Sequence, residues 1–300
     1  MYKIIATVVA VFLVNFIVKA QEFQGMAVYE SKTSISDYKS RMEGNKELTP
    51  EIKKRIEGRM KSMSEKTFIL NFDKSASIYK EEEKLEAPIQ GGGGGGNRSI
   101  MMSAMTPSGG TYYKNVKSKS YSVDREFMGK EFLINDSLPN LRWKLEAETR
   151  VIGGYNCFKA TAVKQLSKSD FRNLRPKKEA TPTTTKPAVE TKKANFMDLL
   201  EIPKEVIVTA WYTPEIPVNQ GPEGYWGLPG LILEVNNGKT VILCSKVVLN
   251  PKVKAEIKEP TKGKIISQQE FDEAVIKKTE EYRSMNQGHG GNNGWRMGRN

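Results

Sequence analysis

Short segments in which apolar and polar residues alternate occur along most of the chain. An alternation with a period of two is typical of β-strands that are buried on one face. The connections are mostly short, and Asn236-Asn237-Gly238 contains an Asn-Gly pair, which tolerates the positive φ angles of a tight hairpin turn. The predicted strands are Gly25–Ser31, Thr67–Phe72, Ala76–Lys80, Thr111–Asn115, Lys119–Asp124, Lys130–Asn135, Leu141–Leu145, Thr149–Ile152, Asn156–Val163, Lys204–Thr213, Leu231–Val235 and Lys239–Leu249.

Two other segments have helical spacing. In the first, Thr49 is a good N-cap and Pro50 suits the first helical position. Its apolar face is expected to lie on the concave side of the sheet and consists of Ile52, Ile56, Met60 and Met63. In the second, Ser267 and Glu270 form a capping box. The apolar face of this C-terminal helix consists of Phe271, Val275 and Tyr282.

These elements predict an α+β fold that is mostly antiparallel β. We expect a single curved sheet or half-barrel, with one helix packed on it and a second helix at the C-terminus. Residues 21–286 would form one β-rich domain. Two segments have no core of their own and are predicted to be flexible insertions, residues 81–110 with a run of six glycines and residues 167–195 with Pro, Thr and Lys. Residues 287–300 form a Gly/Asn/Arg tail that we expect to be disordered.

The first 20 residues have the pattern of a secretory signal peptide. Lys3 precedes an apolar run over residues 4–18, and the β-branched Val18 and the small Ala20 suit cleavage before Gln21. The alternative is a retained membrane anchor, but the run is shorter than the roughly 20 apolar residues of a spanning helix. We therefore expect export to the periplasm, with no integral membrane segment in the mature chain. No Cys follows the cleavage point, so a lipid anchor is not expected.

Charge and histidine content narrow the function classes. The chain of 300 residues carries a net charge of +12, which falls to +10 when Lys3 and Lys19 are removed with the leader. The basic residues are not interleaved with stacking aromatics, so nucleic acid is not an expected partner. Contact with an anionic membrane surface is compatible with this charge. The single histidine, His289, lies in the Gly-rich tail, which disfavours histidine-based catalysis and histidine zinc sites.

Two cysteines, Cys157 and Cys244, are the only ones in the chain. An oxidising compartment permits them to form a disulfide. The alternative is two buried thiols on separate strands. They do not form a C-x-x-C motif, so thiol redox catalysis is not indicated.

The segment Trp211–Val235 is dense in proline, glycine and aromatic residues. It contains Gly227-Leu228-Pro229-Gly230-Leu231-Ile232, and it follows a block that runs from Ile152 to Ala160. With these residues the sequence resembles the GLPGLI family, exported proteins of Gram-negative bacteria without an established activity. The insertion over residues 167–203, the glycine run and the basic tail depart from the family pattern.

This segment, called the motif loop below for residues 214–230, has two interpretations. In one it is a rigid connection whose aromatic side chains fill the core. In the other it contacts a ligand or partner, because prolines and glycines give loops fixed shapes. The candidate binding residues are Trp211, Tyr212, Glu215, Tyr225, Trp226, Leu228 and Pro229.

Elimination favours binding over catalysis, since the sequence contains no nucleophile elbow, zinc-protease motif or dinucleotide loop. We expect a non-enzymatic module of the cell envelope without a cofactor or metal. Its client would be an outer-membrane or other envelope protein, for example a TonB-dependent transporter, or an apolar lipid or peptide. One alternative is a hydrolase that uses only the carboxylates of Glu215 and Glu223. Another is Cu(I) binding by thioethers, with Met60, Met63, Met101, Met102 and Met105 as ligands.

Overall fold

The alternating segments form one large, mostly antiparallel sheet. The computed structural model describes residues 23–36, 39, 43, 49–82, 110–173, 175–176 and 200–288. The predicted leader, the glycine run, most of the 167–195 insertion and the end of the tail lie outside these described residues. The elements are β1 Gly25–Thr33, α3 Pro50–Ser64, β2 Glu65–Phe72, β3 Ala76–Glu81, β4 Tyr112–Asn115, β5 Ser120–Phe127, β6 Lys130–Ser137, β7 Lys144–Ile152, β8 Tyr155–Gln165, β9 Arg175–Pro176, β10 Leu200–Glu201, β11 Glu205–Thr213, β12 Leu231–Asn236, β13 Thr240–Leu249, β14 Lys264–Ile266 and α5 Gln268–Gly288.

Within the described residues the main sheet has 12 strands in the order β14-β6-β5-β4-β3-β2-β1-β13-β12-β11-β8-β7. Neighbouring strands are antiparallel except β14 and β6, which run parallel, so the sheet is mixed. Strands β9 and β10 form a separate pair. The antiparallel prediction is therefore confirmed for most of the sheet.

The short turns hold neighbouring strands in register. Gly238 has φ of +82° in the predicted Asn-Gly turn between β12 and β13. In the turn between β2 and β3, the Asp73 carboxylate accepts hydrogen bonds from the backbone N–H groups of Ser75 and Ala76, at 2.6 and 2.7 Å. The two strands predicted over Leu141–Leu145 and Thr149–Ile152 are instead one strand, β7, with an irregular register opposite β8 between Leu145 and Thr149.

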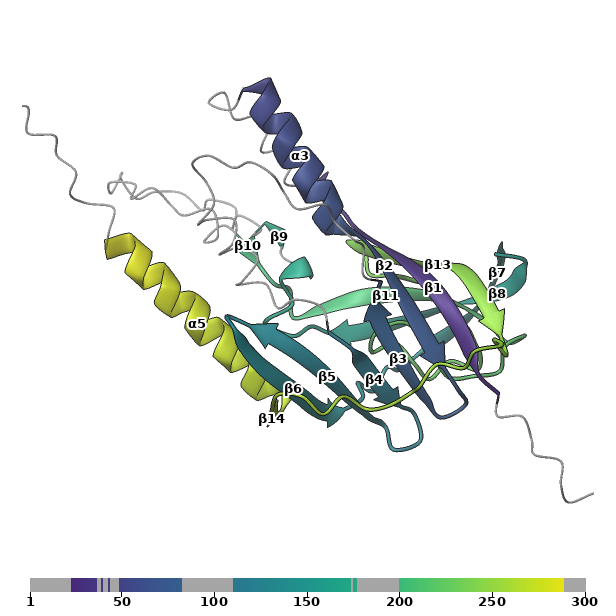
Figure 1. The fold of residues 1–300 in the computed structure, drawn as a ribbon. Helices are drawn as coiled ribbons and strands as arrows, with labels where there is room; N and C mark the ends of the chain where they lie inside the picture. Colours follow the sequence, from purple (N-terminus) through teal and green to yellow (C-terminus); the bar gives the residue numbers. More distant parts are fainter. Residues whose placement is uncertain are drawn as a thin grey trace, which may run out of the picture.

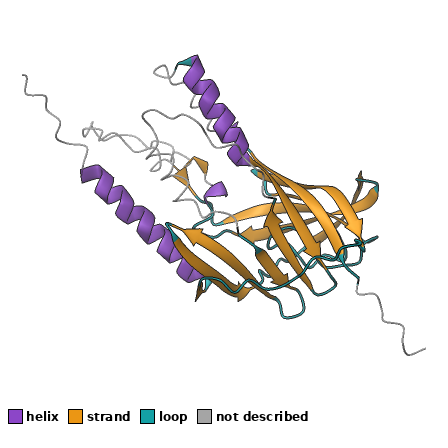
Figure 2. Cartoon of the chain, viewed as in Figure 1, coloured by secondary structure: helices purple, strands orange, loops and turns teal. Residues whose placement is uncertain are grey.

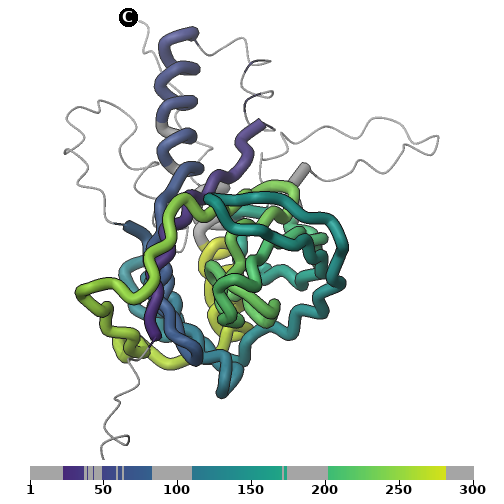
Figure 3. Tube along the Cα trace, turned by 90° about the vertical axis from the view of Figure 1, so that its right-hand side faces the viewer, coloured from purple at the N-terminus to yellow at the C-terminus, as the bar shows by residue number. Residues whose placement is uncertain are grey.

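The sheet is strongly curved (Figures 1 and 2). A view turned by 90° shows the strands curling round the green segment that leads into β12 (Figure 3). Alternate residues of each strand point to the inner side, where Tyr29, Phe72 and Tyr79 are buried. The expectation of a curved sheet is confirmed.

The centre of this curve is filled by the motif loop, whereas α5 covers the same face of the sheet at β5 and β6. Ile216, Val218, Tyr225 and Leu228 are all buried and belong to the main hydrophobic cluster. Backbone carbonyls of the loop are paired with the start of β12. The N–H of Leu231 donates to Ile216 O and the N–H of Ile232 donates to Gln220 O, both at 3.0 Å. Such pairing is needed because unpaired backbone groups are costly to bury.

The predicted position of the first helix is wrong, although its start is right. Thr49 caps α3, with its hydroxyl accepting from Ile52 N at 3.4 Å, and Pro50 is the first helical residue. However, α3 extends away from the sheet and leads directly into β2 (Figure 1), and none of its described side chains is buried. Charged and polar residues make up most of this helix, so it has little apolar surface to bury inside the sheet, whereas the motif loop has much more.

The second helix, α5, forms at the C-terminus as predicted, and it packs on the sheet. The capping box forms, with Ser267 N donating to Glu270 Oε2 at 2.7 Å and Glu270 N to Ser267 Oγ at 3.2 Å. Phe271 and Val275 are buried against β5 and β6, and the Phe271 ring lies 5.5 Å from that of Phe132. In the part of the chain that the structure describes, no helix combines the length and the apolar character needed to cross a membrane.

Gly230 provides a test of how closely the motif loop is packed. A Cβ at this position would lie 2.2 Å from Thr213 O, a contact that the two backbones cannot relieve without moving apart. We expect Gly230→Ala to lower the free energy of unfolding by about 3 kcal/mol or more, as overpacked cores do. Urea unfolding followed by tryptophan fluorescence measures this change.

Gly58→Ala is the matched control, because a Cβ there meets nothing within 4 Å on the exposed face of α3. It should raise the free energy of unfolding by about 0.5–1 kcal/mol through helix propensity. Equal, small effects of both substitutions would show that the motif loop is not tightly packed against β11.

Candidate functional site

Most of the candidate binding residues of the motif loop and β11 belong to the core. Trp211, Tyr212, Tyr225 and Leu228 are buried, so in this conformation their side chains are not available to a partner. The Arg150 guanidinium lies 4.2 Å from the ring centroid of Trp211 and pairs with the Glu234 carboxylate at the outer surface. The interpretation of this segment as a shaped, core-filling connection is supported for these four residues.

The other three candidates lie nearer the surface. The Glu215 carboxylate accepts a hydrogen bond from Asn156 N at 2.8 Å, beside the turn between β7 and β8. Trp226 is half-buried, and its indole N–H donates to Pro139 O at 2.9 Å. In return, the indole N–H of Trp143 donates to Trp226 O at 2.8 Å. Pro229 is exposed. Their contact with a partner stays a prediction.

A buried lysine fixes the motif loop to the sheet. Lys114 lies on the inner side of β4 and is only 1% exposed. Its ammonium group donates to three backbone carbonyls of the loop, Gly221 O at 2.7 Å and Glu223 O and Tyr225 O at 3.0 Å. A lysine ammonium has three donors, so all of them are used. This arrangement closes the turn of residues 221–225 around a single positive charge.

The environment of Lys114 shifts its protonation equilibrium. Burial disfavours the charged form and lowers its pKa from 10.5 to about 7, against an opposing effect of the Glu223 carboxylate. The three carbonyl contacts favour the protonated form. Lys114 is therefore a buried group whose charge is balanced by dipoles and by one nearby carboxylate.

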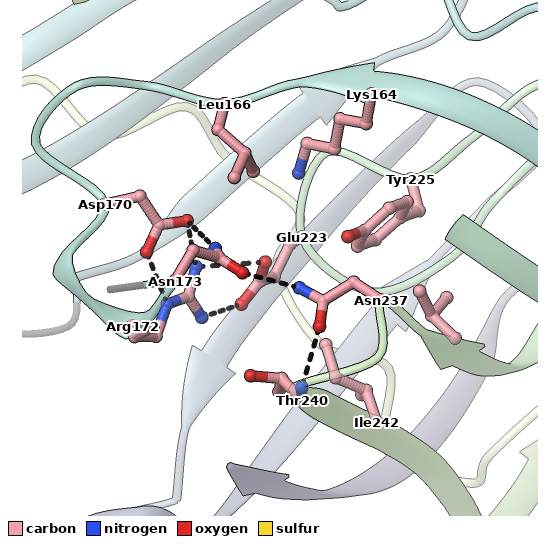
Figure 4. A pocket seen from close by; sticks show the side chains of 11 residues that line it. Lys164, Leu166, Asp170, Arg172, Asn173, Glu223, Tyr225, Asn237, Thr240 and Ile242 are labelled. Atoms are coloured by element: carbon pink, nitrogen blue, oxygen red, sulfur yellow. Dashed lines mark hydrogen bonds and ion pairs between the residues drawn. The ribbon is translucent and has the colours of Figure 1, made fainter. Parts of the chain in front are cut away.

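A small pocket lies directly beside this turn (Figure 4). It has room for about one water molecule. Glu223 and Tyr225 of the motif loop form part of its wall, so the residues that Lys114 holds by their carbonyls present their side chains to the pocket. The remaining lining residues are Lys164, Leu166, Asp170, Arg172, Asn173, Val235, Asn237, Thr240 and Ile242.

Arg172 joins the two acidic side chains of the pocket. Its guanidinium pairs with the Glu223 carboxylate at 2.6 Å and with the Asp170 carboxylate at 3.1 Å. Burial raises the pKa of each carboxyl, but Arg172 more than offsets this, so the pKa of both Glu223 and Asp170 is lowered. Glu223 in turn is the main cause of the raised pKa of Arg172. All three groups are therefore charged near neutral pH.

The amide side chains of the pocket are also engaged. Asn173 donates to the Asp170 carboxylate at 3.1 Å, and its oxygen accepts from Asn237 at 3.2 Å. The Asn237 oxygen accepts from Thr240 N at 2.7 Å within the β12–β13 turn. The network thus links the 3₁₀ helix of residues 171–173 to that turn (Figure 4).

Lys164 differs from its neighbours in the pocket. Its ammonium group lies 4.3 Å from the ring centroid of Tyr225 and, within the described residues, makes no hydrogen bond or ion pair. Burial lowers its pKa, but Tyr225, Glu223 and Asp170 outweigh this effect and the pKa is raised. Lys164 is therefore a charged group that faces the pocket without a carboxylate of its own.

Sequence reasoning missed this site for two identifiable reasons. Lys114 and Lys164 occupy positions in alternating strands where a charge normally marks the outer face. Asp170, Arg172 and Asn173 lie inside the polar 167–195 segment, whose composition predicts no structure of its own. One signal in the sequence was usable, because residues two apart in a strand point to the same face of the sheet. Lys114 lies two residues from Tyr112, and Lys164 lies two residues from the buried Ala162.

The two cysteines are present as free thiols, and both are buried. Strands β11 and β12 separate β8, which carries Cys157, from β13, which carries Cys244. Burial is the main cause that raises the pKa of each thiol to about 11. Both thiols are therefore protonated and weakly nucleophilic at neutral pH.

The residues of the two alternative chemistries are not brought into one described site. Glu215 accepts from the Asn156 backbone, whereas Glu223 pairs with Arg172, so no contact joins the two carboxylates. Met101, Met102 and Met105 lie outside the described residues, and so does the side chain of Met63. Across the described ranges, no group of three or more His, Cys, Asp or Glu side chains is placed to hold a metal ion.

Comparison with known proteins gives one family. The profile of a family described as "Protein of unknown function (Porph_ging)", found in Bacteroidetes, matches residues 143–234. This range includes Lys164, Arg172 and the motif loop but not Lys114. No match was found among curated proteins.

Two solved structures are similar to the chain over most of its length. "Structure of PNGF-II in C2 space group" has 15% identity and a TM-score of 0.44 and covers 85% of this chain and 33% of that one. "Structure of PNGF-II in P21 space group" has 13% identity and a TM-score of 0.43, with coverages of 86% and 34%. The chain thus spans about a third of the length of these proteins.

Replacing Lys114 tests its role as the anchor of the motif loop. Lys114→Met keeps the length of the side chain but leaves three buried carbonyls without donors, and each such loss costs about 1–3 kcal/mol. Because the substitution also removes the cost of burying a charge, we expect a net loss of roughly 3 kcal/mol in the free energy of unfolding. Urea denaturation of this variant and of Lys117→Met, at an exposed position of the following turn, measures the difference. Equal stabilities would contradict the anchoring role.

The same pair of proteins tests the pKa of Lys114. With a folded-state pKa of about 7 and an ordinary value of 10.5, the unfolded chain binds more protons between these pH values. The contribution of Lys114 to the free energy of unfolding must therefore rise with pH across this window, by at most about 1.4 kcal/mol per pH unit. Unfolding at pH 6, 7.5 and 9 should give a difference between wild type and Lys114→Met that grows with pH. A constant difference would mean that Lys114 keeps its ordinary pKa.

Proposed function

We propose that this protein is a non-enzymatic binding module of the cell envelope, exported to the periplasm by a cleaved leader, and that its client is an outer-membrane or other envelope protein. The proposal includes membership of the GLPGLI family. A TonB-dependent transporter remains one example of a client. The family profile over residues 143–234 carries no activity of its own, so the argument rests on the site.

The observation that carries the proposal is that buried side chains of the motif loop fill the space inside the curved sheet. A carrier of apolar lipids needs an internal cavity, but Ile216, Tyr225 and Leu228 occupy the corresponding space here. The client therefore has to meet the outside of the domain. This favours a protein over an apolar guest held by the sheet.

The state of the polar groups favours binding over catalysis. A general acid or base needs a pKa near the working pH and a free position towards the substrate. Glu223 and Asp170 instead have lowered pKa values and are paired with Arg172. The thiols of both cysteines are protonated and buried. Fixed charges of this kind are suited to recognising a charged group on a partner.

The pocket beside the motif loop is the contact that we expect the client to use, because the Lys164 ammonium there lies over the Tyr225 ring but forms no ion pair with a carboxylate of the described residues. The test is affinity capture from solubilised envelope fractions, with the mature chain as bait. Wild type should enrich one outer-membrane protein. Lys164→Glu reverses the charge at the pocket and should reduce its recovery at least about tenfold, the effect of roughly 1.4 kcal/mol in binding.

Lys252→Glu is the matched control, since it makes the same change at an exposed position of the segment that follows β13. It should capture the client as well as wild type does. Recovery of the same proteins with all three baits, or of no envelope protein with any of them, would count against the proposed function.

A further inference from the structure

The two margins of the main sheet are built differently. Strand β14 forms one margin with only three residues, and short edge strands of this kind offer little backbone for another chain to pair with. Strand β7 forms the other margin with nine residues, and within the described part of the chain β8 is its only neighbour in the sheet (Figure 1). Because β7 contains no proline, its outer edge is a row of backbone groups that a further strand can pair with.

The hairpin turn Gly153-Gly154 between β7 and β8 sets which backbone groups face this open margin. The residues on either side of a two-residue turn exchange the hydrogen bonds that close it, and the direction of the backbone groups then alternates along the strand. The N–H and C=O groups of Val151 and Thr149 therefore point away from β8. The same holds for Leu145 beyond the irregular register, because its partner on β8 lies two residues from the partner of Thr149.

The side chains of β7 leave this margin apolar on the inner side of the sheet. Leu145 and Val151 face this side and are 56% and 65% exposed. On the outer side, three of the four charged side chains of β7 form ion pairs with residues of β8 and β12. These charges are thus engaged within the chain, and the open margin combines unpaired backbone with exposed apolar side chains.

We propose that β7 pairs with β7 of a second copy of this chain, antiparallel and with the two-fold axis at Glu148. In this register all nine residues of the strand have a partner. Leu145 lies opposite Val151 of the second copy, so exposed apolar side chains cover each other at both ends of the pair. Between them, Ala147 lies opposite Thr149 of the second copy. The residues that meet in these pairs are those whose backbone groups point to the open margin.

Charge complementarity favours this register over its neighbours. Glu146 lies opposite Arg150 of the second copy, and the symmetry repeats this pair on the other side of the axis. An axis one residue earlier would instead place Glu146 opposite Glu148. One like-charge contact remains, Glu148 with its own copy, but each of these carboxylates lies 2.7 Å from Lys159 Nζ of its own chain. The inference goes beyond the proposed function, because this dimer forms without a client.

The oligomeric state of the mature chain tests the proposal. Sedimentation velocity at concentrations up to about 500 μM should show a reversible monomer–dimer equilibrium, with a Kd on the order of 100 μM or tighter, as expected of a small and transient interface. Val253→Lys is a control for replacing an exposed apolar residue, since Val253 is 87% exposed in the segment that follows β13. This variant should dimerise as wild type does.

Two double variants that differ only in the sign of one charge test the register. Leu145→Lys with Val151→Lys places like charges opposite each other at both ends of the strand pair and should weaken dimerisation at least about tenfold. Leu145→Glu with Val151→Lys places opposite charges there and should dimerise within about threefold of wild type. Both positions are more than half exposed in the single chain, so both variants should fold, which urea unfolding checks.

A cysteine at the axis tests the symmetry directly. A residue on the two-fold axis of an antiparallel pair lies opposite its own copy, close enough for a disulfide. Oxidised glutathione should therefore link two copies of Glu148→Cys, seen as a dimer on a non-reducing gel, and should link Val253→Cys much less. The native Cys157 and Cys244 are buried and should not contribute.

The outcomes separate self-pairing from other uses of this margin. A monomer at every concentration, equal dimerisation of the two double variants, or equal linking of Glu148→Cys and Val253→Cys overturns the proposal. A monomeric wild type whose envelope capture is lost with Leu145→Lys and Val151→Lys also overturns it, because the margin then belongs to the client. A dimer with the expected pattern, without capture of any envelope protein, supports this inference and rejects the proposed function.

Discussion

The structure depends on one buried charge. Lys114 places an ammonium group inside the sheet, where an uncompensated charge would be expensive, and three carbonyls of residues 221–225 compensate it. Each partner needs the other: without the loop the charge is unpaired, and without the charge three carbonyls lose their donors. This mutual requirement explains why a segment so rich in proline and glycine takes one conformation inside the sheet. It also explains why the space that similar curved sheets could offer to a guest is occupied here.

The same contacts position the pocket. Glu223 gives its carbonyl to Lys114 and its carboxylate to Arg172, and Tyr225 gives its carbonyl to Lys114 while its ring lies under the Lys164 ammonium. The turn of residues 221–225 thus contacts the interior of the sheet on one side and lines the pocket on the other. A change that loosens the turn would move two walls of the pocket at once, whereas a change at Arg172 would leave the interior largely intact. Stability and binding are therefore separable by the choice of residue.

Much of the fold was predictable from local patterns, because alternation, the capping box and the Asn-Gly turn act over a few residues. The position of α3 was not, since the spacing of Ile52, Ile56 and Met60 defines an apolar face but not what covers it. Lys114 shows the limit most clearly. Its acceptors lie 107 to 111 residues further along the chain, so nothing near it in the sequence indicates that its charge is compensated. Asp170 and Arg172 were likewise hidden in a segment whose composition is that of a linker.

The backbone of Glu223 adds a last constraint. Its φ of +46° lies in the left-handed region, where glycine or asparagine is usual and other residues are held by their surroundings. Gly224 follows it directly and Gly221 lies two residues before it, so glycine occurs at this turn but glutamate stands at the strained position. Lys114 holds the carbonyl of Glu223 and Arg172 holds its carboxylate, which together supply the surroundings that the conformation requires. A loop that served only to fill the core would gain nothing from a carboxylate there. The strain is accounted for if the carboxylate is needed on the pocket side, where it fixes Arg172 and sets the charge that an incoming group meets.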